Sequence, residues 1–149
     1  EAAAFVWPAR VYWEDTDAGG IVFYANYLKF FERARTEWLR QLGLGQQALR
    51  EQTGGMFVVS DCALHYRQSA RLDDLLLVTA SPVEVGKASL TIAQSALLKP
   101  QQAGDAPTLL CEGSIRIGWV DAANLRPQRI PRAVLQVLQA GRATPAPTT

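Results

Sequence analysis

The sequence predicts an α+β domain in which one antiparallel sheet covers one long apolar helix. Three observations carry this prediction. A helical apolar stripe begins at Tyr27, a strand-like run precedes it, and four strand-like runs follow it up to about Asp121. With 149 residues, 48% of them apolar and 19% charged, the chain can bury one core. Residues 1–141 are therefore expected to form a single domain, with a mobile tail at 142–149.

The first two elements are a strand and the long helix. "ARVYWEDTD", residues 9–17, is rich in aromatic and β-branched side chains and ends in an acidic turn. The helical stripe then holds its spacing for more than four turns, through Tyr27, Phe31, Ala34, Trp38 and Leu42, and is widened by Leu28, Phe30 and Leu39. Gly43 and Gly45 are expected to end this helix. A shorter helix follows in "GQQALREQTGG", residues 45–55.

The remaining elements are four strands and a last helix. The strands are expected at residues 56–67, 73–85, 88–99 and 108–120. In the last of them one face is apolar, namely Leu109, Cys111, Gly113, Ile115, Ile117 and Trp119. Gly86-Lys87 is expected to form a two-residue hairpin with a positive φ at the glycine, and residues 100–107 a longer polar turn. Pro131 suits the first position of a helix that presents Val134, Val137 and Leu138 before Gly141.

Composition excludes several classes of function. The formal net charge of +1 gives no basic surface for nucleic acid, and no apolar run reaches the length of a membrane span. Cys62 and Cys111 lie outside any zinc or disulfide spacing and are expected to pack as small core residues. The start of the chain lacks a signal-peptide pattern, so a cytoplasmic protein is expected, although the absent initiator Met leaves a removed signal peptide open.

"EDTDAGG", residues 14–20, carries three carboxylates and two glycines directly after the first strand. It could be a calcium loop, an ordinary acidic turn or a catalytic carboxylate. A calcium loop starting at Asp15 would place Gly19 and Asn26 where a side-chain ligand and a bidentate Glu are needed, and no helix precedes it. The calcium interpretation is therefore disfavoured, whereas an acidic turn remains a plain alternative.

Other catalytic chemistries have no residues to support them. The chain has one histidine, His65, no G-x-S-x-G nucleophile elbow and no complete phosphate loop. If it is an enzyme, the acid-base or nucleophilic group is expected to be a carboxylate, with His65 as the weaker alternative. Asp17 lies beside two glycines that let a ligand approach the backbone. Free N–H groups at the start of the long helix could polarise a carbonyl oxygen. This combination suits acyl transfer.

Two further charged positions have both a structural and a functional interpretation. Glu32 and Arg35 are three residues apart on the helix, where a structural ion pair beside the core is the plainer expectation. Lys87 at its hairpin tip is either a solvated turn residue or a phosphate contact.

The stretch "VYWEDTDAGGIVFYANYLKFFERARTEWL", Val11–Leu39, resembles the signature of the Tol-Pal-associated acyl-CoA thioesterases, relatives of 4-hydroxybenzoyl-CoA thioesterase in the hotdog-fold superfamily. "ARLDD", residues 70–74, also resembles a strand connection of that family. The resemblance implies the hotdog fold: a curved antiparallel five-stranded sheet wrapped around one long helix.

The resemblance also implies hydrolysis of acyl-CoA without a metal or cofactor. Asp17 would act as nucleophile or general base, and the main-chain N–H of Tyr24 would polarise the thioester carbonyl; many relatives carry His at that position. The implied substrate-binding residues are Gly19, Gly20, Asn26, Glu32 and Lys87. Arg67 and Arg71 are, with Lys87, candidates for the CoA phosphates.

The resemblance further implies a homo-oligomer, a dimer or a homotetramer, with sheets joined edge to edge and active sites at the subunit interface. Relatives are linked to the Tol-Pal system, to lipid metabolism and to acyl carrier protein, which makes acyl carrier protein a possible partner. A hotdog module that binds acyl-CoA or acyl carrier protein without turnover is the alternative function. A hydratase is disfavoured, because no histidine lies near the helix.

Overall fold

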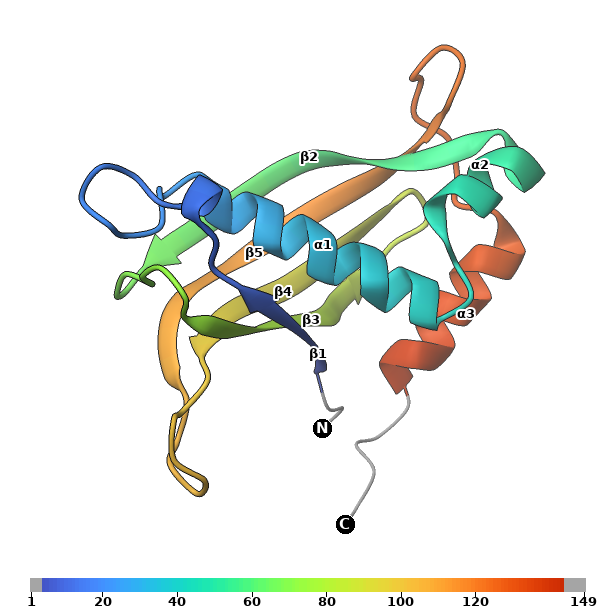
Figure 1. The fold of residues 1–149 in the computed structure, drawn as a ribbon. Coiled ribbons are helices and arrows are strands. Elements are labelled where there is room, and N and C mark those ends of the chain that lie inside the picture. Colours follow the sequence, from blue (N-terminus) through green and yellow to red (C-terminus); the bar gives the residue numbers. More distant parts are fainter. Residues whose placement is uncertain (1–3, 144–149) are drawn as a thin grey trace.

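Five strands of the computed structural model, which describes residues 4–143, form one antiparallel sheet with the order β1-β3-β4-β5-β2 (Figure 1). The strands are β1 (Phe5–Arg10), β2 (Gly55–Tyr66), β3 (Leu75–Val85), β4 (Ser89–Leu98) and β5 (Thr108–Asp121). Hairpins join β3 to β4 and β4 to β5, while β1 pairs with β3 and β2 with β5. The predicted α+β class and the five-stranded antiparallel sheet are confirmed.

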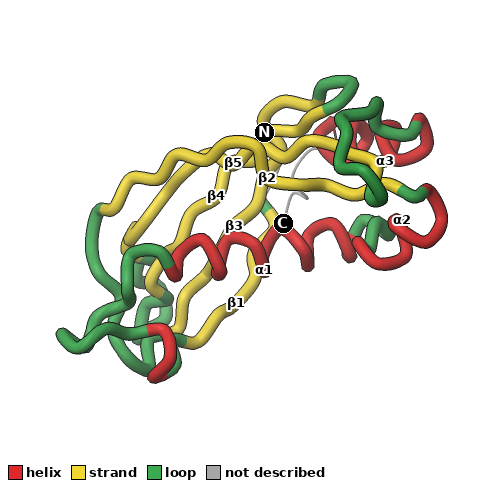
Figure 2. The backbone as a smooth tube through the Cα atoms, turned by 90° about the horizontal axis from the view of Figure 1, so that it is seen from above, coloured by secondary structure: helices red, strands yellow, loops and turns green. Residues whose placement is uncertain are grey.

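The long helix α1 (Asn26–Gln41) packs against β1, β3 and β4 on one face of this sheet. Seen from above, it runs along the sheet, and α2 (Gln46–Thr53) and α3 (Arg132–Ala143) lie beyond its C-terminal end (Figure 2). Its buried face contains Phe30, Phe31 and Leu39. Gly43, with φ of +82°, follows the helix as expected. The hotdog arrangement predicted for this chain is therefore present.

Edge strand β2 is only partly covered, because α1 lies over the other half of the sheet. Cys62 and Val59 are consequently exposed, Val59 by 52%. The prediction that both cysteines are core residues holds for Cys111 and is wrong for Cys62. Leu28, expected in the apolar stripe of α1, is also 38% exposed on the side of the helix that the sheet does not cover.

The first strand ends earlier in the chain than the sequence pattern predicts. β1 ends at Arg10, and Trp13–Asp15 form a 3₁₀ turn. The Asp15 carboxylate accepts the N–H of Tyr12 at 2.8 Å, and the Asp15 N–H donates to the Tyr12 carbonyl at 3.0 Å. This local capping satisfies main-chain groups that a longer strand would have paired, so the aromatic residues before Asp15 leave the sheet.

Three details differ from expectation near the other strands. Gly86 has no positive φ; its N–H donates to the Ser89 carbonyl at 2.8 Å, so Lys87 and Ala88 form the hairpin turn. A register shift next to Leu97 buries Leu110, while Leu109 is only half-buried. Helix α3 continues past Gly141 to Ala143.

The rest of the predicted tail, residues 144–149, lies outside the described residues. None of the helices in residues 4–143 is long and apolar enough to span a membrane.

Candidate active site

Asp17 lies in a tight hairpin between Thr16 and Val22, which form an isolated antiparallel bridge. The Asp17 N–H donates to the Ile21 carbonyl at 2.9 Å, and the Gly20 N–H donates to the Asp17 carbonyl at 3.0 Å. Gly20 has a φ of +80°, the left-handed conformation that glycine adopts without strain. This turn explains the two glycines after Asp17 and gives the carboxylate a fixed backbone.

The Asp17 carboxylate is exposed and only partly engaged. Its Oδ1 accepts the N–H of Gly19 at 2.8 Å, a local bond that orients the side chain. Within residues 4–143 its Oδ2 has no hydrogen-bond donor. One carboxylate oxygen is therefore held by the turn, and the other is available to a substrate or a water molecule.

The main chain just before α1 has an N–H group without an acceptor. Phe23 donates its N–H to the Asp15 carbonyl at 3.0 Å, and Asn26 donates its N–H to the Phe23 carbonyl at 2.8 Å. Between them, the N–H of Tyr24 makes no hydrogen bond to any residue that the structure describes. Such a free N–H beside the positive end of a helix is suited to an oxygen that gains negative charge.

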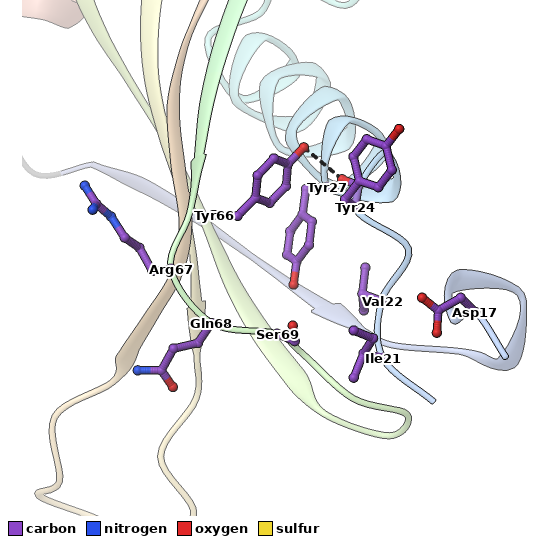
Figure 3. Close-up of a pocket in the computed structure, with 9 residues that line it drawn as sticks. All are labelled: Asp17, Ile21, Val22, Tyr24, Tyr27, Tyr66, Arg67, Gln68 and Ser69. Atoms are coloured by element: carbon purple, nitrogen blue, oxygen red, sulfur yellow. Dashed lines mark hydrogen bonds between the residues drawn. The ribbon is translucent and has the colours of Figure 1, made fainter. Parts of the chain in front are cut away.

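Asp17 and Tyr24 meet at one cavity of about 300 Å³ (Figure 3). Its lining comes from the Asp17 hairpin, the start of α1 and the chain that follows β2: Asp17, Ile21, Val22, Tyr24, Tyr27, Tyr66, Arg67, Gln68 and Ser69. The cavity is therefore lined by the residue with the exposed carboxylate, by the residue whose N–H has no acceptor among residues 4–143, and by aromatic rings, while the Arg67 side chain points away from Asp17 (Figure 3). That set of groups can hold an acyl group and polarise its carbonyl.

Tyr66 links the edge strand β2 to the start of α1. Its hydroxyl donates to the carbonyl of Tyr24 at 3.1 Å, as the dashed line in Figure 3 shows. Its ring lies 6.1 Å from the ring of Tyr24 and 5.8 Å from that of Tyr27, both edge to face. Burial raises the pKa of Tyr66, so the hydroxyl keeps its proton and remains a donor at neutral pH.

Tyr27 forms the buried wall of the cavity. Its side chain is 2% exposed, and its hydroxyl oxygen accepts the N–H of Ala70 at 3.1 Å. Burial raises its pKa, partly offset by that hydrogen bond. The Tyr27 proton has no acceptor among residues 4–143, which leaves a donor on the wall of the cavity.

The structure brings only some of the predicted residues together. Asp17, Tyr24 and Arg67 line the cavity; Gly19 and Gly20 shape the turn without lining it. Asn26 does not line it either, because its side-chain amide donates to the Asp15 carbonyl at 2.8 Å.

Two of the basic residues predicted to contact CoA, Arg71 and Lys87, do not line the cavity. Arg71 is exposed and pairs through its main chain with Ile21. Lys87 lies at the β3–β4 turn near α3, since its carbonyl accepts the N–H of Ile130. That turn is at the opposite end of the sheet from the Asp17 hairpin (Figure 1).

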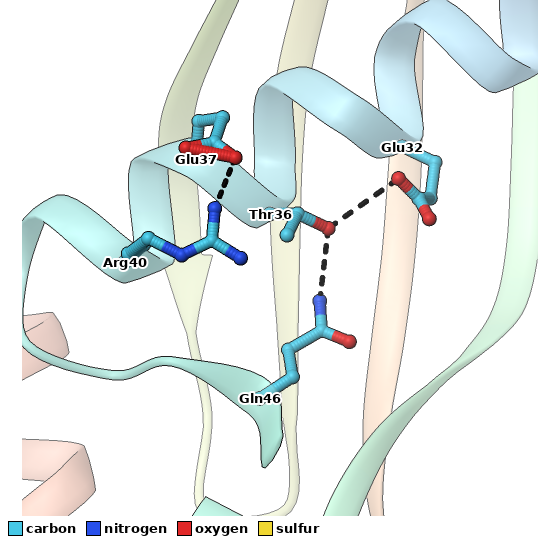
Figure 4. A network of polar contacts seen from close by, with 5 residues as sticks. All are labelled: Glu32, Thr36, Glu37, Arg40 and Gln46. Atoms are coloured by element: carbon cyan, nitrogen blue, oxygen red, sulfur yellow. Dashed lines mark hydrogen bonds and ion pairs between the residues drawn. The ribbon is translucent and has the colours of Figure 1, made fainter. Parts of the chain in front are cut away.

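Glu32 faces a second cavity of about 270 Å³ on the exposed side of α1, lined also by Leu28, Lys29 and Arg33. Its carboxylate accepts the Thr36 hydroxyl at 3.4 Å, and Gln46 donates to Thr36 at 3.1 Å, which ties α1 to the start of α2 (Figure 4). Glu37 and Arg40 form a separate ion pair nearby on α1 (Figure 4).

The predicted ion pair between Glu32 and Arg35 is wrong. Arg35 is 8% exposed and donates instead to Gln94 Oε1 at 3.0 Å, on the sheet side of α1. Burial lowers the pKa of Arg35, and the charge of Glu32 partly offsets this effect. The arginine therefore joins α1 to β4 rather than flanking the core.

No sequence pattern identifies Tyr66 as a residue of the cavity, and the pattern around Tyr27 assigns that residue to the core instead. Tyr66 ends a strand 42 residues after Tyr24, and Tyr27 belongs to the apolar stripe that predicted the core.

Within residues 4–143, no three His, Cys, Asp or Glu side chains converge in a way that could hold a metal ion.

The comparisons agree on the family. The thioesterase superfamily pattern matches residues 19–103. The acyl-CoA thioesterase YbgC of Haemophilus influenzae is 41% identical over 130 residues, which cover 87% of this chain and 90% of that protein. The acyl-CoA thioester hydrolase YbgC of Escherichia coli O6:H1 is 38% identical over 131 residues, which cover 88% of this chain and 92% of that protein.

Solved structures share the fold. A probable thioesterase from Bartonella henselae is 29% identical with a TM-score of 0.75, over 87% of this chain and 100% of that one. A 4-hydroxybenzoyl-CoA thioesterase mutant, complexed with 4-hydroxybenzoyl-CoA, gives a TM-score of 0.82 at 19% identity, over 92% of this chain and 99% of that one. With a family match over more than half of its length and two relatives above 30% identity, the chain belongs to the thioesterase superfamily.

Proposed function

We propose that this protein hydrolyses the thioester of an acyl-CoA to a free carboxylic acid and CoA. The observation that carries the proposal is that two residues line the same cavity: Asp17, whose carboxylate is exposed, and Tyr24, whose N–H has no acceptor among residues 4–143. The names of the Haemophilus influenzae and Escherichia coli relatives, at 41% and 38% identity, support the substrate class.

In the proposed reaction the thioester carbonyl oxygen accepts the Tyr24 N–H at the start of α1. The developing oxyanion is stabilised there by that donor and by the positive end of the helix. The Asp17 carboxylate has two possible roles. It either deprotonates a water molecule that attacks the carbonyl carbon, or it attacks that carbon itself and forms an anhydride that water then hydrolyses. In both cases the C–S bond breaks and CoA leaves as the thiolate.

The remaining cavity residues fit the two ends of the substrate. The rings of Tyr24, Tyr27 and Tyr66 give the acyl group an apolar wall. Arg67 is a candidate for an anionic group of CoA, although its Nε already donates to Glu112 at 3.3 Å. Lys87 belongs to the β3–β4 turn, at the opposite end of the sheet from the Asp17 hairpin, so we infer that it contacts CoA bound in the site of a neighbouring subunit.

We further propose a homo-oligomer. Strand β2 is 12 residues long, lies at the edge of the sheet and exposes Val59 and Cys62 on its partly uncovered side. A long, partly apolar edge strand tends to pair with another chain. Pairing at β2 would place a second subunit next to Tyr66, and therefore next to the cavity.

The test of the proposed hydrolysis is Asp17→Asn, which keeps the size of the side chain and removes its charge. We expect kcat to fall at least about 100-fold, the lower bound of general-base catalysis. Affinity for acyl-CoA, measured by calorimetry with a thioether analogue, should stay within a few-fold. Asp105→Asn, at an exposed turn outside the cavity, is the matched control and should keep the parent rate.

The opposite result favours the alternative function. If parent and Asp17→Asn hydrolyse a broad panel of acyl-CoA substrates equally slowly while both bind the thioether analogue, hydrolysis is not the function. A module that binds acyl-CoA without turnover would then be the better description.

A further inference from the structure

Asn26, the first residue of α1, directs its side chain away from its own helix. The residue is 9% exposed, and its Nδ2 donates to the main-chain carbonyl of Asp15 at 2.8 Å, 11 residues earlier in the chain. The N-cap position itself is Ala25, which has no side-chain cap. The amide of Asn26 therefore does not cap α1; it ties the start of α1 to the segment that carries Asp17.

The Asp15 carbonyl receives a second donor from the same region. The Phe23 N–H donates to this oxygen at 3.0 Å, beside the Asn26 amide at 2.8 Å. One oxygen atom, two residues before Asp17, is thus held from two directions by the chain on both sides of Tyr24. Asp15 is only 4% exposed, so this anchor lies in the buried part of the fold.

The main chain of Asn26 fixes the other half of the site. Its N–H donates to the Phe23 carbonyl at 2.8 Å. The Phe23 carbonyl and the Tyr24 N–H belong to the same planar peptide unit, so holding the oxygen also sets the direction of the N–H. Asn26 therefore contacts the peptide that presents the free N–H with its main chain, and the anchor of the Asp17 hairpin with its side chain.

We propose that Asn26 is a positioning residue that sets the distance and angle between the Asp17 carboxylate and the Tyr24 N–H. This inference rests on the proposed thioester hydrolysis. Asn26 does not line the cavity and needs no contact with the substrate. This positioning role replaces the substrate-binding role that the sequence predicts for Asn26, because the Asn26 amide is buried against Asp15.

Without the amide, the Asp15 carbonyl keeps only the Phe23 N–H, and the acidic hairpin can move relative to α1. The two catalytic groups need to reach the same carbonyl, and an error of about 1 Å can cost on the order of 100-fold in rate. Substrate binding depends mainly on the cavity walls and on CoA contacts elsewhere. The expected effect is therefore on kcat rather than on KM.

The experiment compares Asn26→Ala and Asn26→Asp with the parent. Asn26→Asp has the same size, but an ionised carboxylate cannot donate to the Asp15 carbonyl. Both variants should lose about 10- to 100-fold in kcat, the range expected for misplaced groups, with KM within about threefold.

The matched control is Gln94→Ala. Gln94 is another buried amide, 1% exposed, whose Nε2 donates to the Phe31 carbonyl of α1 at 2.9 Å, away from the cavity. The loss of this amide should lower the unfolding temperature, as the Asn26 changes are also expected to do, and should leave kcat within about twofold. A loss of stability alone would therefore not reproduce the Asn26 result.

A double-mutant cycle with Asp17→Asn separates positioning from a general structural effect. Once the Asp17 charge is gone, its placement matters less, so Asn26→Ala should cost clearly less in that background. Equal losses in both backgrounds, a kcat within threefold of the parent, or a change confined to KM would each overturn the proposal. If Asn26→Ala does not fold, Asn26→Ser, which keeps one donor, and Asn26→Asp carry the same comparison.

The two proposals can fail separately. If the parent has no turnover, or if Asp17→Asn keeps it, the proposed hydrolysis is wrong. If Asp17→Asn removes turnover while the Asn26 variants keep it, only the positioning role is wrong.

Discussion

Two changes of tyrosine to phenylalanine at the cavity should have different effects, because among residues 4–143 the Tyr66 hydroxyl makes a hydrogen bond and the Tyr24 hydroxyl makes none. Tyr66→Phe removes the O–H that donates to the Tyr24 carbonyl at 3.1 Å. A neutral hydrogen bond contributes about 0.5–1.5 kcal/mol. Tyr66 is 47% exposed, so water can reach the freed carbonyl, and a stability loss of about 0.5–1 kcal/mol is expected.

That free energy also limits the effect on catalysis. If all of it serves to hold Tyr24 in place, kcat can fall by no more than about tenfold, since 1.36 kcal/mol corresponds to a factor of ten. Tyr24→Phe removes a hydroxyl from a side chain that is 64% exposed and leaves the main-chain N–H in place. It should keep kcat within about twofold, because the proposed donor is the N–H and not the side chain.

The assay is steady-state release of CoA at several acyl-CoA concentrations, together with thermal unfolding of each variant. A loss beyond about 100-fold in Tyr24→Phe, the scale of losing an oxyanion donor, would mean that its hydroxyl takes part, and the main-chain argument would fail. A comparable loss in Tyr66→Phe would show that Tyr66 acts on the substrate directly. No change at all in Tyr66→Phe would show that its bond to Tyr24 does not organise the site.

The remaining predictions concern the cysteines and the assembly. Burial raises the pKa of the Cys111 thiol to about 11, so at pH 8 it stays protonated and covered, while Cys62 is exposed. A maleimide should therefore label Cys111 only after denaturation, whatever the accessibility of Cys62 in the assembled protein; rapid labelling of Cys111 in the native protein would contradict this. Light scattering at micromolar concentration should show a dimer or tetramer, because β2 is an unpaired edge of the sheet, and a monomer would count against a shared active site.

The fold could be predicted because its main signals are local. The stripe on α1 and the strand runs have periods that differ clearly, and their order leaves one sheet to cover one helix. The first strand was misplaced because aromatic residues before the acidic turn have high strand propensity, whereas Asp15 caps a 3₁₀ turn there. Cys62 was misplaced because no local pattern says how far across the sheet α1 reaches.

Some residues of the site can likewise be predicted from local sequence, and others cannot. Asp17 and Tyr24 are seven residues apart in one motif, so the sequence could bring them together. Tyr66 reaches Tyr24 from the far edge of the sheet, and that contact exists only once β2 has paired with β5. The orientation of Asn26 was also hidden, since an asparagine at a helix start is equally suited to capping, to ligand binding or to the interior contact that it makes.

The site must also exclude water during the reaction. An N–H donor and a carboxylate act more strongly on a carbonyl when water is excluded, because the local dielectric constant is lower. Yet Asp17 is exposed, and Tyr24 and Tyr66 are 64% and 47% exposed in the single chain. The hydrogen bonds around Asp15 and Asn26 set the geometry within one chain. Water has to be excluded by whatever covers these exposed residues: the acyl-CoA itself and, if β2 pairs as proposed, the neighbouring subunit.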